Sequence, residues 1–444
     1  MVFLILNIFL IPSLWISKYF FKKWINPLSL YSIIWYFMLT FYHLKLVNYI
    51  DLSPLTWYVI IASHLALFLG SITFFLAKNS FPSEQSTTKT QQSKNDFIEQ
   101  HLKTFFYLSL IFGLIGLGSA LQVWFVLIKL FHSIVGVLFH LGKVYQMRVS
   151  GELKGIIPFL SVFIFASIFF SAVYSAYFGK IKLISLLPLA SLIIKHIALV
   201  SRASILLGFL EYGLTFIFVY YFLSSQNKTI TKKGKTLLLQ LTILGLIFIL
   251  SAVAIKNLRG AAESLSGETR TLRKLEDSPF LSPSIYLYLS GHVGTLEKFL
   301  SLSKENTRFG ENTFLFIYSL LGKLGMVKKP SGYQQGYYIP VWINTGTYIR
   351  ELIADYTFPG ALLFIYFLGL FVSFSWIKFF YEGDLLYLSI LVFFSLIVVM
   401  SFLVMITRLT NWYLSLIFIT AIIQIIKKHK FRDTTELQLS ENKI

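Results

Sequence analysis

The chain has 444 residues, of which 56% are hydrophobic and 13% charged, and its formal net charge is +19. Soluble domains average roughly 45–50% apolar and about 25% charged residues, so this composition excludes an ordinary soluble globular protein. No cysteine is present, which excludes a disulfide framework, a thiolate metal site and a cysteine nucleophile. The composition predicts an all-α polytopic integral membrane protein.

About eleven apolar runs approach the roughly 20 residues that a helix needs to cross a bilayer. They lie at about 3–20, 27–46, 54–77, 104–127, 156–178, 183–200, 203–224, 236–256, 358–378, 385–406 and 409–426. The first eight form a predicted transmembrane bundle over 1–256, and the other three occupy 358–426. The first run lacks a basic start and a small-residue cleavage site, so we expect it to be retained as a span.

Basic residues between these spans set the predicted orientation. Lysines flank a Ser/Thr/Gln-rich linker at 78–103, and basic residues also follow the first, fifth and seventh spans and fill the tail at 427–444. These clusters share one side of the membrane if the N-terminus is outside and the C-terminus inside. We therefore expect a cytoplasmic linker and tail. The same rule accounts for the net charge without a nucleic-acid partner.

This orientation places the segment 129–155 outside the membrane. Its first half is apolar but too short to span, and its second half is basic. Such a segment is typical of an amphipathic or re-entrant piece that lies in the membrane interface.

The turn between the sixth and seventh predicted spans carries Arg202 and is too short to be a solvated loop. In the resulting hairpin, Lys195 and His196 lie at a depth similar to that of Glu211. A carboxylate within a span is costly unless it is paired or lines a cavity. Glu211 is therefore either a functional residue or half of an ion pair that fixes the hairpin.

The longest predicted segment outside the membrane is 257–357, and it holds nine of the chain's 20 carboxylates together with many tyrosines and turn residues. A linker would be poorer in aromatic residues. We expect a folded, partly helical extracytoplasmic loop that carries most of the chemistry.

Cations gather on the predicted outer face near the membrane surface: Lys143, Arg148, Arg202, Arg259, Arg270, Arg273, Arg350 and Arg408. Arg is well shaped for bidentate contacts to phosphate, so the set suits a lipid-linked phosphate or pyrophosphate. The alternative is that these side chains meet lipid headgroups or pair with carboxylates of the loop.

Three side chains of the loop are candidate general bases. Glu351 and Asp355 are four residues apart and share one face of a predicted helix, with Arg350 beside them. A solvated helix face, or capping by Asp355, is the alternative. His292 could act as a base or hydrogen-bond donor, or be a structural residue. No spacing predicts a metal site, and no nucleotide fingerprint is present, so we expect neither a metal nor another cofactor.

Several stretches, taken in their order along the chain, resemble the oligosaccharide repeat-unit polymerases, the Wzy-type O-antigen and capsule polymerases. They are NPLSLYSIIW (26–35), SRASILLGFLEYG (201–213), SPSIYLYLSGHVGTLEKFL (282–300), RFGENTFLFIYSLLGKLG (308–325) and NTGTYIRELIADYTFPG (344–360). Members of that family carry an Arg, ten intervening residues and a Gly. Arg202 and Gly213 have this spacing, whereas Gly360 follows Arg350 one residue early.

The resemblance implies a membrane glycosyltransferase in the bacterial cytoplasmic membrane. It would transfer a growing glycan from undecaprenyl pyrophosphate to the non-reducing end of a new lipid-linked repeat unit, outside the membrane. Arg202 would stabilise the leaving pyrophosphate, and Glu351, Asp355 or His292 would engage the attacking hydroxyl. Further expected contacts to pyrophosphate or glycan come from Arg148, Arg259, Arg270, Arg273, Arg350, Arg408 and Tyr348.

The same resemblance suggests a flippase and a chain-length regulator as partners. Three other functions stay open from the sequence. One is an O-antigen-ligase-like transferase, which has a similar architecture and a different acceptor. Another is a polysaccharide flippase or transporter, which would need charged residues along a path through several spans. The third is a sensor or assembly scaffold, in which each of the arginines could be replaced singly.

Overall fold

The computed structural model describes residues 2–80, 97–225, a few residues between 242 and 251, 283–302, 307–331 and 334–441. Five described helices are long and apolar enough to cross a membrane: Pro54–Ala77, Leu102–Phe131, Arg202–Ser224, Tyr348–Glu382 and Thr410–Lys428. Four shorter apolar helices accompany them: Leu6–Phe21, Ser161–Tyr177, Leu183–Ala198 and Leu385–Val399. An all-α membrane protein is thereby confirmed, whereas the count of eleven spans and the loop topology stay predictions. Most of the predicted span 236–256 lies outside the described residues.

The chain divides into two compact units. Unit 1 is built from segments within 1–84, 264–376 and 394–410, so it joins the first three helices to the described part of the predicted loop. Its complete elements are α1 (Val2–Phe21), α2 (Pro27–His43), α3 (Pro54–Ser80), α13 (Pro283–Leu302), α14 (Leu315–Lys323), β1 (Tyr337–Tyr338), β2 (Trp342–Ile343) and η4 (Ile406–Arg408). The described part of 257–357 is folded and partly helical, as we expected.

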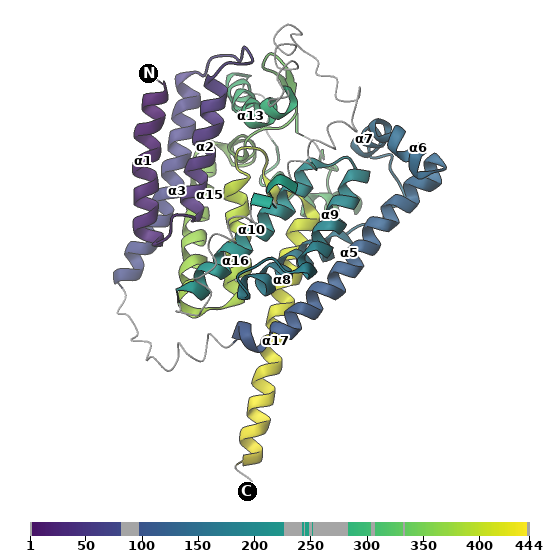
Figure 1. The fold of residues 1–444 in the computed structure, drawn as a ribbon. Coiled ribbons are helices and arrows are strands. Elements are labelled where there is room, and N and C mark those ends of the chain that lie inside the picture. Colours follow the sequence, from purple (N-terminus) through teal and green to yellow (C-terminus); the bar gives the residue numbers. More distant parts are fainter. Residues whose placement is uncertain are drawn as a thin grey trace. The chain divides into compact units, whose positions relative to one another are not determined.

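Unit 2 is built from segments within 85–263, 377–393 and 411–444. Its complete elements are α5 (Leu102–Phe131), α6 (Ile134–Phe139), α7 (Leu141–Ser150), α8 (Ser161–Tyr177), η1 (Leu183–Ser185), α9 (Leu186–Ala198) and α10 (Arg202–Ser224). Helices α15 (Tyr348–Glu382) and α16 (Leu385–Val399) contribute to both units, and α17 (Thr410–Glu441) continues through the predicted tail. Helix α8 packs against α5 and α10, and α9 packs against α5 (Figure 1).

In unit 1, the helices α1, α2 and α3 run side by side (Figure 1). Helix α3 also crosses α15 at two glycines. A Cβ at Gly70 would overlap the main-chain carbonyl of Tyr366, and a Cβ at Gly369 would overlap that of Leu67. The Ser71 hydroxyl donates to the Gly369 carbonyl at 3.1 Å. Small residues of this kind let membrane helices approach closely without a side chain between them.

Helix α15 consists of two helices joined at Thr357, where φ is 61° and ψ is 174°. Pro359 contributes to this break, because a proline lacks the N–H that would donate to the carbonyl four residues earlier. The break therefore falls at the last residue of the predicted loop, next to the predicted span that begins at 358. The first part of α15 therefore belongs to the loop, and the apolar second part begins at the predicted span boundary.

The segment 129–155 is helical in two short pieces. Helix α5 runs on to Phe131, and α6 and α7 follow it. Residues of α7 pack into an apolar cluster with the end of α9 and the start of α10, so α7 is held against the helix bundle of unit 2. The buried members from these three elements are Leu141, Val144, Ala198, Val200 and Ile205.

Candidate functional site

The first turn of α15 is buried in the centre of unit 1. The Tyr348 hydroxyl lies 3.2 Å from that of Tyr31, and the Tyr348 main-chain N–H donates to the Ser401 carbonyl at 2.8 Å. The Trp35 indole donates to the Ser401 hydroxyl at 2.9 Å. Tyr348, which we expected to contact glycan, is fully covered. It fastens the start of α15 to α2 and to the chain beyond α16.

One turn along, the Glu351 carboxylate is surrounded by donors. One oxygen accepts from Arg408 at 2.8 Å and from the Gln334 amide, and the other accepts from the Met405 main-chain N–H at 2.7 Å. The carboxylate is buried, and the Arg408 guanidinium compensates its charge. An ion pair this deep costs desolvation and is retained only where further hydrogen bonds satisfy both partners.

Arg408 satisfies that condition. Besides Glu351, its guanidinium donates to the Asn312 side-chain oxygen at 2.7 Å and to the Ser331 carbonyl at 3.2 Å. It therefore links η4, α15 and the chain on either side of α14. The sequence shows no sign of this arrangement, because the linked residues lie tens of positions apart and follow no spacing rule.

Asp355 accepts five hydrogen bonds, and both of its oxygens are used. Three bonds come from the Thr307 hydroxyl at 2.6 Å and from the main-chain N–H and amide of Asn312 at 3.0 and 2.9 Å. Two more come from the main-chain N–H and hydroxyl of Thr313, at 2.8 and 2.9 Å. This pattern favours the capping alternative, with the cap placed on the turn before α14, and it disfavours a general base.

Arg350 is also enclosed. Its guanidinium donates to the Gln335 carbonyl at 2.8 Å and lies over the ring of Tyr337, with 4.8 Å between the central carbon and the ring centroid. Gly346 makes room for it, because a Cβ there would come within 3.0 Å of the Arg350 chain. Glu351, Asp355 and Arg350, predicted near the end of the loop, are thus each held by hydrogen bonds within unit 1, and Arg408 joins them from η4.

His292 differs from these residues. It is buried in α13, and its Nδ1 lies 3.0 Å from the Thr345 hydroxyl. Its Nε2 has no hydrogen-bond partner among the described residues. Burial lowers the pKa of His292 to about 4, so the ring is neutral at neutral pH. Of the three predicted bases, it alone has a buried side-chain atom without a hydrogen-bond partner among the described residues.

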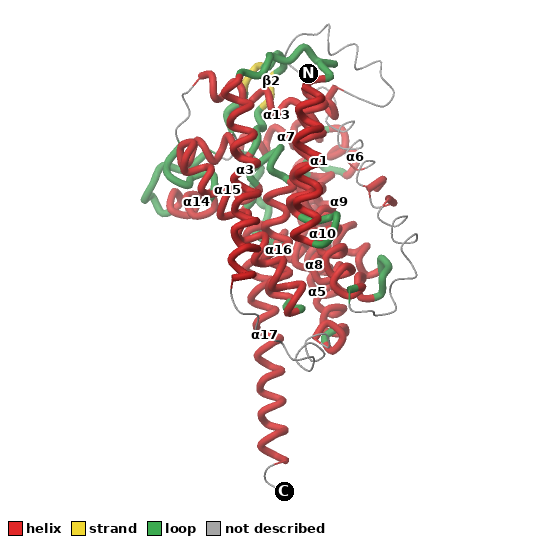
Figure 2. Tube along the Cα trace, turned by 90° about the vertical axis from the view of Figure 1, so that its left-hand side faces the viewer, coloured by secondary structure: helices red, strands yellow, loops and turns green. Residues whose placement is uncertain are grey.

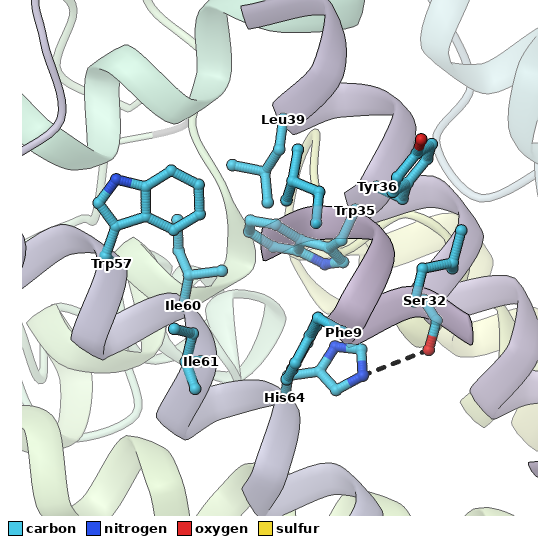
Figure 3. Close-up of a pocket in the computed structure, with 11 residues that line it drawn as sticks. Phe9, Ser32, Trp35, Tyr36, Leu39, Trp57, Ile60, Ile61 and His64 are labelled. Carbon is cyan, nitrogen blue, oxygen red and sulfur yellow. Dashed lines mark hydrogen bonds between the residues drawn. The ribbon is translucent and has the colours of Figure 1, made fainter. Parts of the chain in front are cut away.

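An apolar pocket lies between α1, α2 and α3 in unit 1 (Figure 3). Phe9, Trp35 and Trp57 form much of its wall. His64 stands at one side, with Nε2 3.3 Å from the hydroxyls of both Ser13 and Ser32. Ser401 connects the pocket to the start of α15. Its hydroxyl accepts from the Trp35 indole, and its carbonyl accepts from the main-chain N–H of Tyr348. No sequence pattern predicts it, since its lining is ordinary transmembrane composition.

In unit 2, the buried ammonium of Lys195 donates to the hydroxyls of Ser119 and Ser161, at 2.6 and 2.7 Å. No ion pair joins it to Glu211 in the described part of the chain, so of the two alternatives left open for Glu211, an ion pair with Lys195 is not observed. Glu211 is buried as well, and one of its oxygens has no hydrogen-bond partner there. Neither serine was among the residues that the sequence suggested.

Further basic groups lie near Lys195. His196 is buried and neither ring nitrogen has a hydrogen-bond partner among the described residues. The charges of Lys195 and Arg148 both act on its ring. Arg148 lies in the last turn of α7, with its central guanidinium carbon 5.4 Å from the centroid of the Tyr145 ring. Arg202 is the first residue of α10 and is only 8% exposed, so the expectation that it is held against the bundle is confirmed.

The remaining predicted residues Arg259, Arg270 and Arg273 lie outside the described residues. No group of three His, Asp or Glu side chains in the described ranges is arranged to hold a metal ion. In comparisons with known proteins, no family model, no curated protein and no solved structure matches this chain.

Proposed function

We propose that the protein polymerises lipid-linked oligosaccharide repeat units at the outer face of the bacterial cytoplasmic membrane. The growing glycan would leave undecaprenyl pyrophosphate and join the non-reducing end of a new repeat unit, as in capsule, O-antigen or exopolysaccharide synthesis. The bond that breaks joins the anomeric carbon to pyrophosphate, and the bond that forms joins that carbon to an acceptor hydroxyl. The hydroxyl proton passes to a base or to water.

The observation that carries the proposal is the basic interior of unit 2. Lys195 is buried with hydroxyl partners in place of a carboxylate, and the charges of Lys195 and Arg148 both act on the neighbouring His196 ring. Buried cations are normally compensated by an anion. A pyrophosphate leaving group would supply that anion, and cations beside it would stabilise the charge that develops as the glycosidic bond breaks. Arg202, buried at the start of α10, belongs to the same helical hairpin.

Unit 1 supports roles in holding an acceptor. Both carboxylates of its Arg350–Glu351–Asp355–Arg408 network accept internal hydrogen bonds at each oxygen, so Glu351 and Asp355 would shape the loop without exchanging protons. His292 is the better candidate for orienting the attacking hydroxyl, because Nε2 is unused and the neutral ring accepts a hydrogen bond. This order reverses the one that the sequence suggests.

The apolar pocket of unit 1 supports a lipid-linked substrate. Its lining of Trp, Phe, Leu and Ile side chains would offer an apolar chain a packing surface by van der Waals contact. The pocket lies between helices that include the membrane-crossing α3, where a polyprenyl tail would be found.

The proposal is tested by deleting the gene and resolving envelope glycans and extracted lipid-linked saccharides on gels. Single repeat units in place of long polymer would support polymerisation. Complete polymer left on its lipid carrier would instead indicate a ligase. Repeat units confined to the inner face would indicate a flippase, and unchanged glycans would overturn the proposal.

The complemented strain allows residue-level tests. Arg202→Ala should abolish polymer while the protein stays inserted, and Arg202→Lys should rescue poorly, because lysine cannot make a bidentate phosphate contact. Lys195→Met removes the buried charge and keeps the side-chain length, so it should also stop polymer formation. Lys45→Met is the matched control, because Lys45 lies on an exposed turn. A normal ladder from Arg202→Ala would remove the role given to that residue.

A further inference from the structure

Helix α14 and the residues around it carry apolar side chains that nothing in the described chain covers. Leu320, Leu324 and Met326 are 56%, 65% and 69% exposed, and Ile317 is exposed on the same side of the helix as Leu320 and Leu324. Phe309, just before the helix, is also exposed. Figure 2 shows α14 at the left edge of the view. Exposed apolar residues that are contiguous, unlike single ones, mark an interaction surface.

The charged side chains of α14 and of the chain that follows it have one sign. Lys323, Lys328 and Lys329 are exposed beside the apolar side chains, and the sequence from 312 to 350 contains no Asp or Glu. An apolar stripe with lysines at its border is typical of helices that lie in a membrane interface. A second copy of the chain would fit poorly, because a symmetric contact would bring the two sets of lysines together.

Contacts within unit 1 bring α14 to the ends of apolar helices, where the membrane surface is expected. Helix α14 packs against η4, which forms the turn between the apolar helices α16 and α17. The residues just before α14 are hydrogen-bonded to Asp355, two residues before the break at Thr357 where the apolar part of α15 begins.

Aromatic side chains gather where the apolar part of α15 begins. Phe309 contacts Tyr356 edge to face at 4.9 Å, and Tyr356 stacks on Phe364 of the apolar part of α15 at 6.0 Å. Phe358 contacts the exposed Tyr58 near the start of α3 at 5.7 Å. Tyrosines at the ends of membrane helices gather at the boundary between hydrocarbon and water.

From these observations we infer that α14 lies flat in the membrane interface, with Ile317, Leu320 and Leu324 among the acyl chains and Lys323, Lys328 and Lys329 on anionic lipid phosphates. The lysines would each contribute electrostatic attraction to an anionic leaflet. The loop is thereby anchored to the bilayer at a second place besides its covalent connections. This inference requires a membrane protein and is independent of the proposed polymerase activity.

The absence of cysteine makes the inference directly testable, because one introduced cysteine is the only thiol in the chain. The full-length variants Leu320→Cys and Leu324→Cys would carry a nitroxide spin label in phosphatidylcholine vesicles with and without phosphatidylglycerol. Power saturation then compares contact with oxygen, which partitions into lipid, and with a water-soluble nickel chelate. Ser301→Cys, at the exposed end of α13, is the matched control.

We expect the ratio of oxygen to nickel contact to be several-fold higher at Leu320→Cys and Leu324→Cys than at Ser301→Cys. Replacing Lys323, Lys328 and Lys329 together by Gln should lower that ratio, chiefly in vesicles that contain phosphatidylglycerol. Dominant nickel contact at both α14 sites would overturn the inference. Dipolar broadening between labels at 320 would show a second copy on this surface, and would overturn it too.

Discussion

At the scale of residues, Glu351 and Asp355 look equivalent in the sequence and have different surroundings in the structure. Glu351 is paired with Arg408 and also accepts from a main-chain N–H, whereas Asp355 accepts only from uncharged hydroxyl, amide and main-chain groups. The first holds η4 against α15, and the second organises the turn that precedes α14. Both therefore act on the shape of the loop.

We expect Asp355→Asn to destabilise the protein. The substitution keeps the shape but replaces one acceptor oxygen by an NH₂ group that faces N–H and O–H donors, and unsatisfied buried groups cost roughly 1–3 kcal/mol each. Thermal unfolding of the purified protein should show a lower midpoint. Asp51→Asn, whose side chain is 86% exposed, should leave it unchanged. An unaltered midpoint together with lost polymer would instead make Asp355 a functional carboxylate.

His292 predicts a specific dependence of stability on pH. Its pKa is lowered to about 4 in the folded protein, against about 6.5 in an unfolded chain. The folded state therefore disfavours the protonated ring. The stability linked to His292 is fully present above about pH 6.5 and is lost progressively as the pH falls toward 4.

The check is a comparison of unfolding midpoints for wild type and His292→Gln between pH 7.5 and pH 4.5. The difference between the two should be constant at the upper end and shrink at the lower end, because only the wild type has this ring to protonate. Parallel profiles across the whole range would contradict the assignment of a buried neutral histidine.

At the scale of elements, the crossing of α3 and α15 depends on having no side chain at two positions. Gly70 and Gly369 each lie directly against a main-chain carbonyl of the other helix. A carbonyl cannot rotate aside as a flexible side chain can. The first helices are thereby joined to the helix that carries Arg350, Glu351 and Asp355.

Gly70→Ala should therefore push the two helices apart. Overpacking typically costs about 1–3 kcal/mol, and the loss should appear as a lower unfolding midpoint and a lower yield of inserted protein. Gly118→Ala in α5 is the matched control, because no atom lies within 4 Å of its added methyl group and alanine favours helix. Equal behaviour of the two variants would show that the close approach does not contribute to stability.

At the scale of the whole molecule, the orientation in the membrane rests on the positive-inside pattern. That pattern predicts that the loop at 257–357 lies outside and the tail at 427–444 inside. The described helices support a polytopic membrane protein, and the orientation itself follows from the distribution of lysine and arginine along the chain.

Labelling of single cysteines tests this orientation. Ser301→Cys should react with a membrane-impermeant maleimide in intact cells, because it lies in the predicted outer loop. Asp433→Cys in the tail should react only after the membrane is permeabilised. The cysteine-free parent provides the blank. Labelling of the tail in intact cells would reverse the topology.

The sequence by itself determined the membrane class, most of the helix positions and the burial of Arg202, because hydrophobic runs and charges report directly on the cost of placing a residue in lipid. The residues Arg350, Glu351, Asp355 and His292 were also identified from it as candidates. Residue type and spacing along the chain were enough to select these four side chains, without knowledge of the fold.

Only the tertiary structure decided what those residues do. Arg408 meets Glu351 across 57 positions, Lys195 takes serine partners in place of Glu211, and Trp35 joins the pocket to Ser401. Hydrogen bonds of this kind depend on which helices pack together. In a membrane, lipid-facing and protein-facing helix surfaces are both hydrophobic, so hydrophobicity does not select the packing partners. Close-fitting small residues contribute more to that selection. Periodicity and charge along the chain therefore do not predict which helices pack against one another.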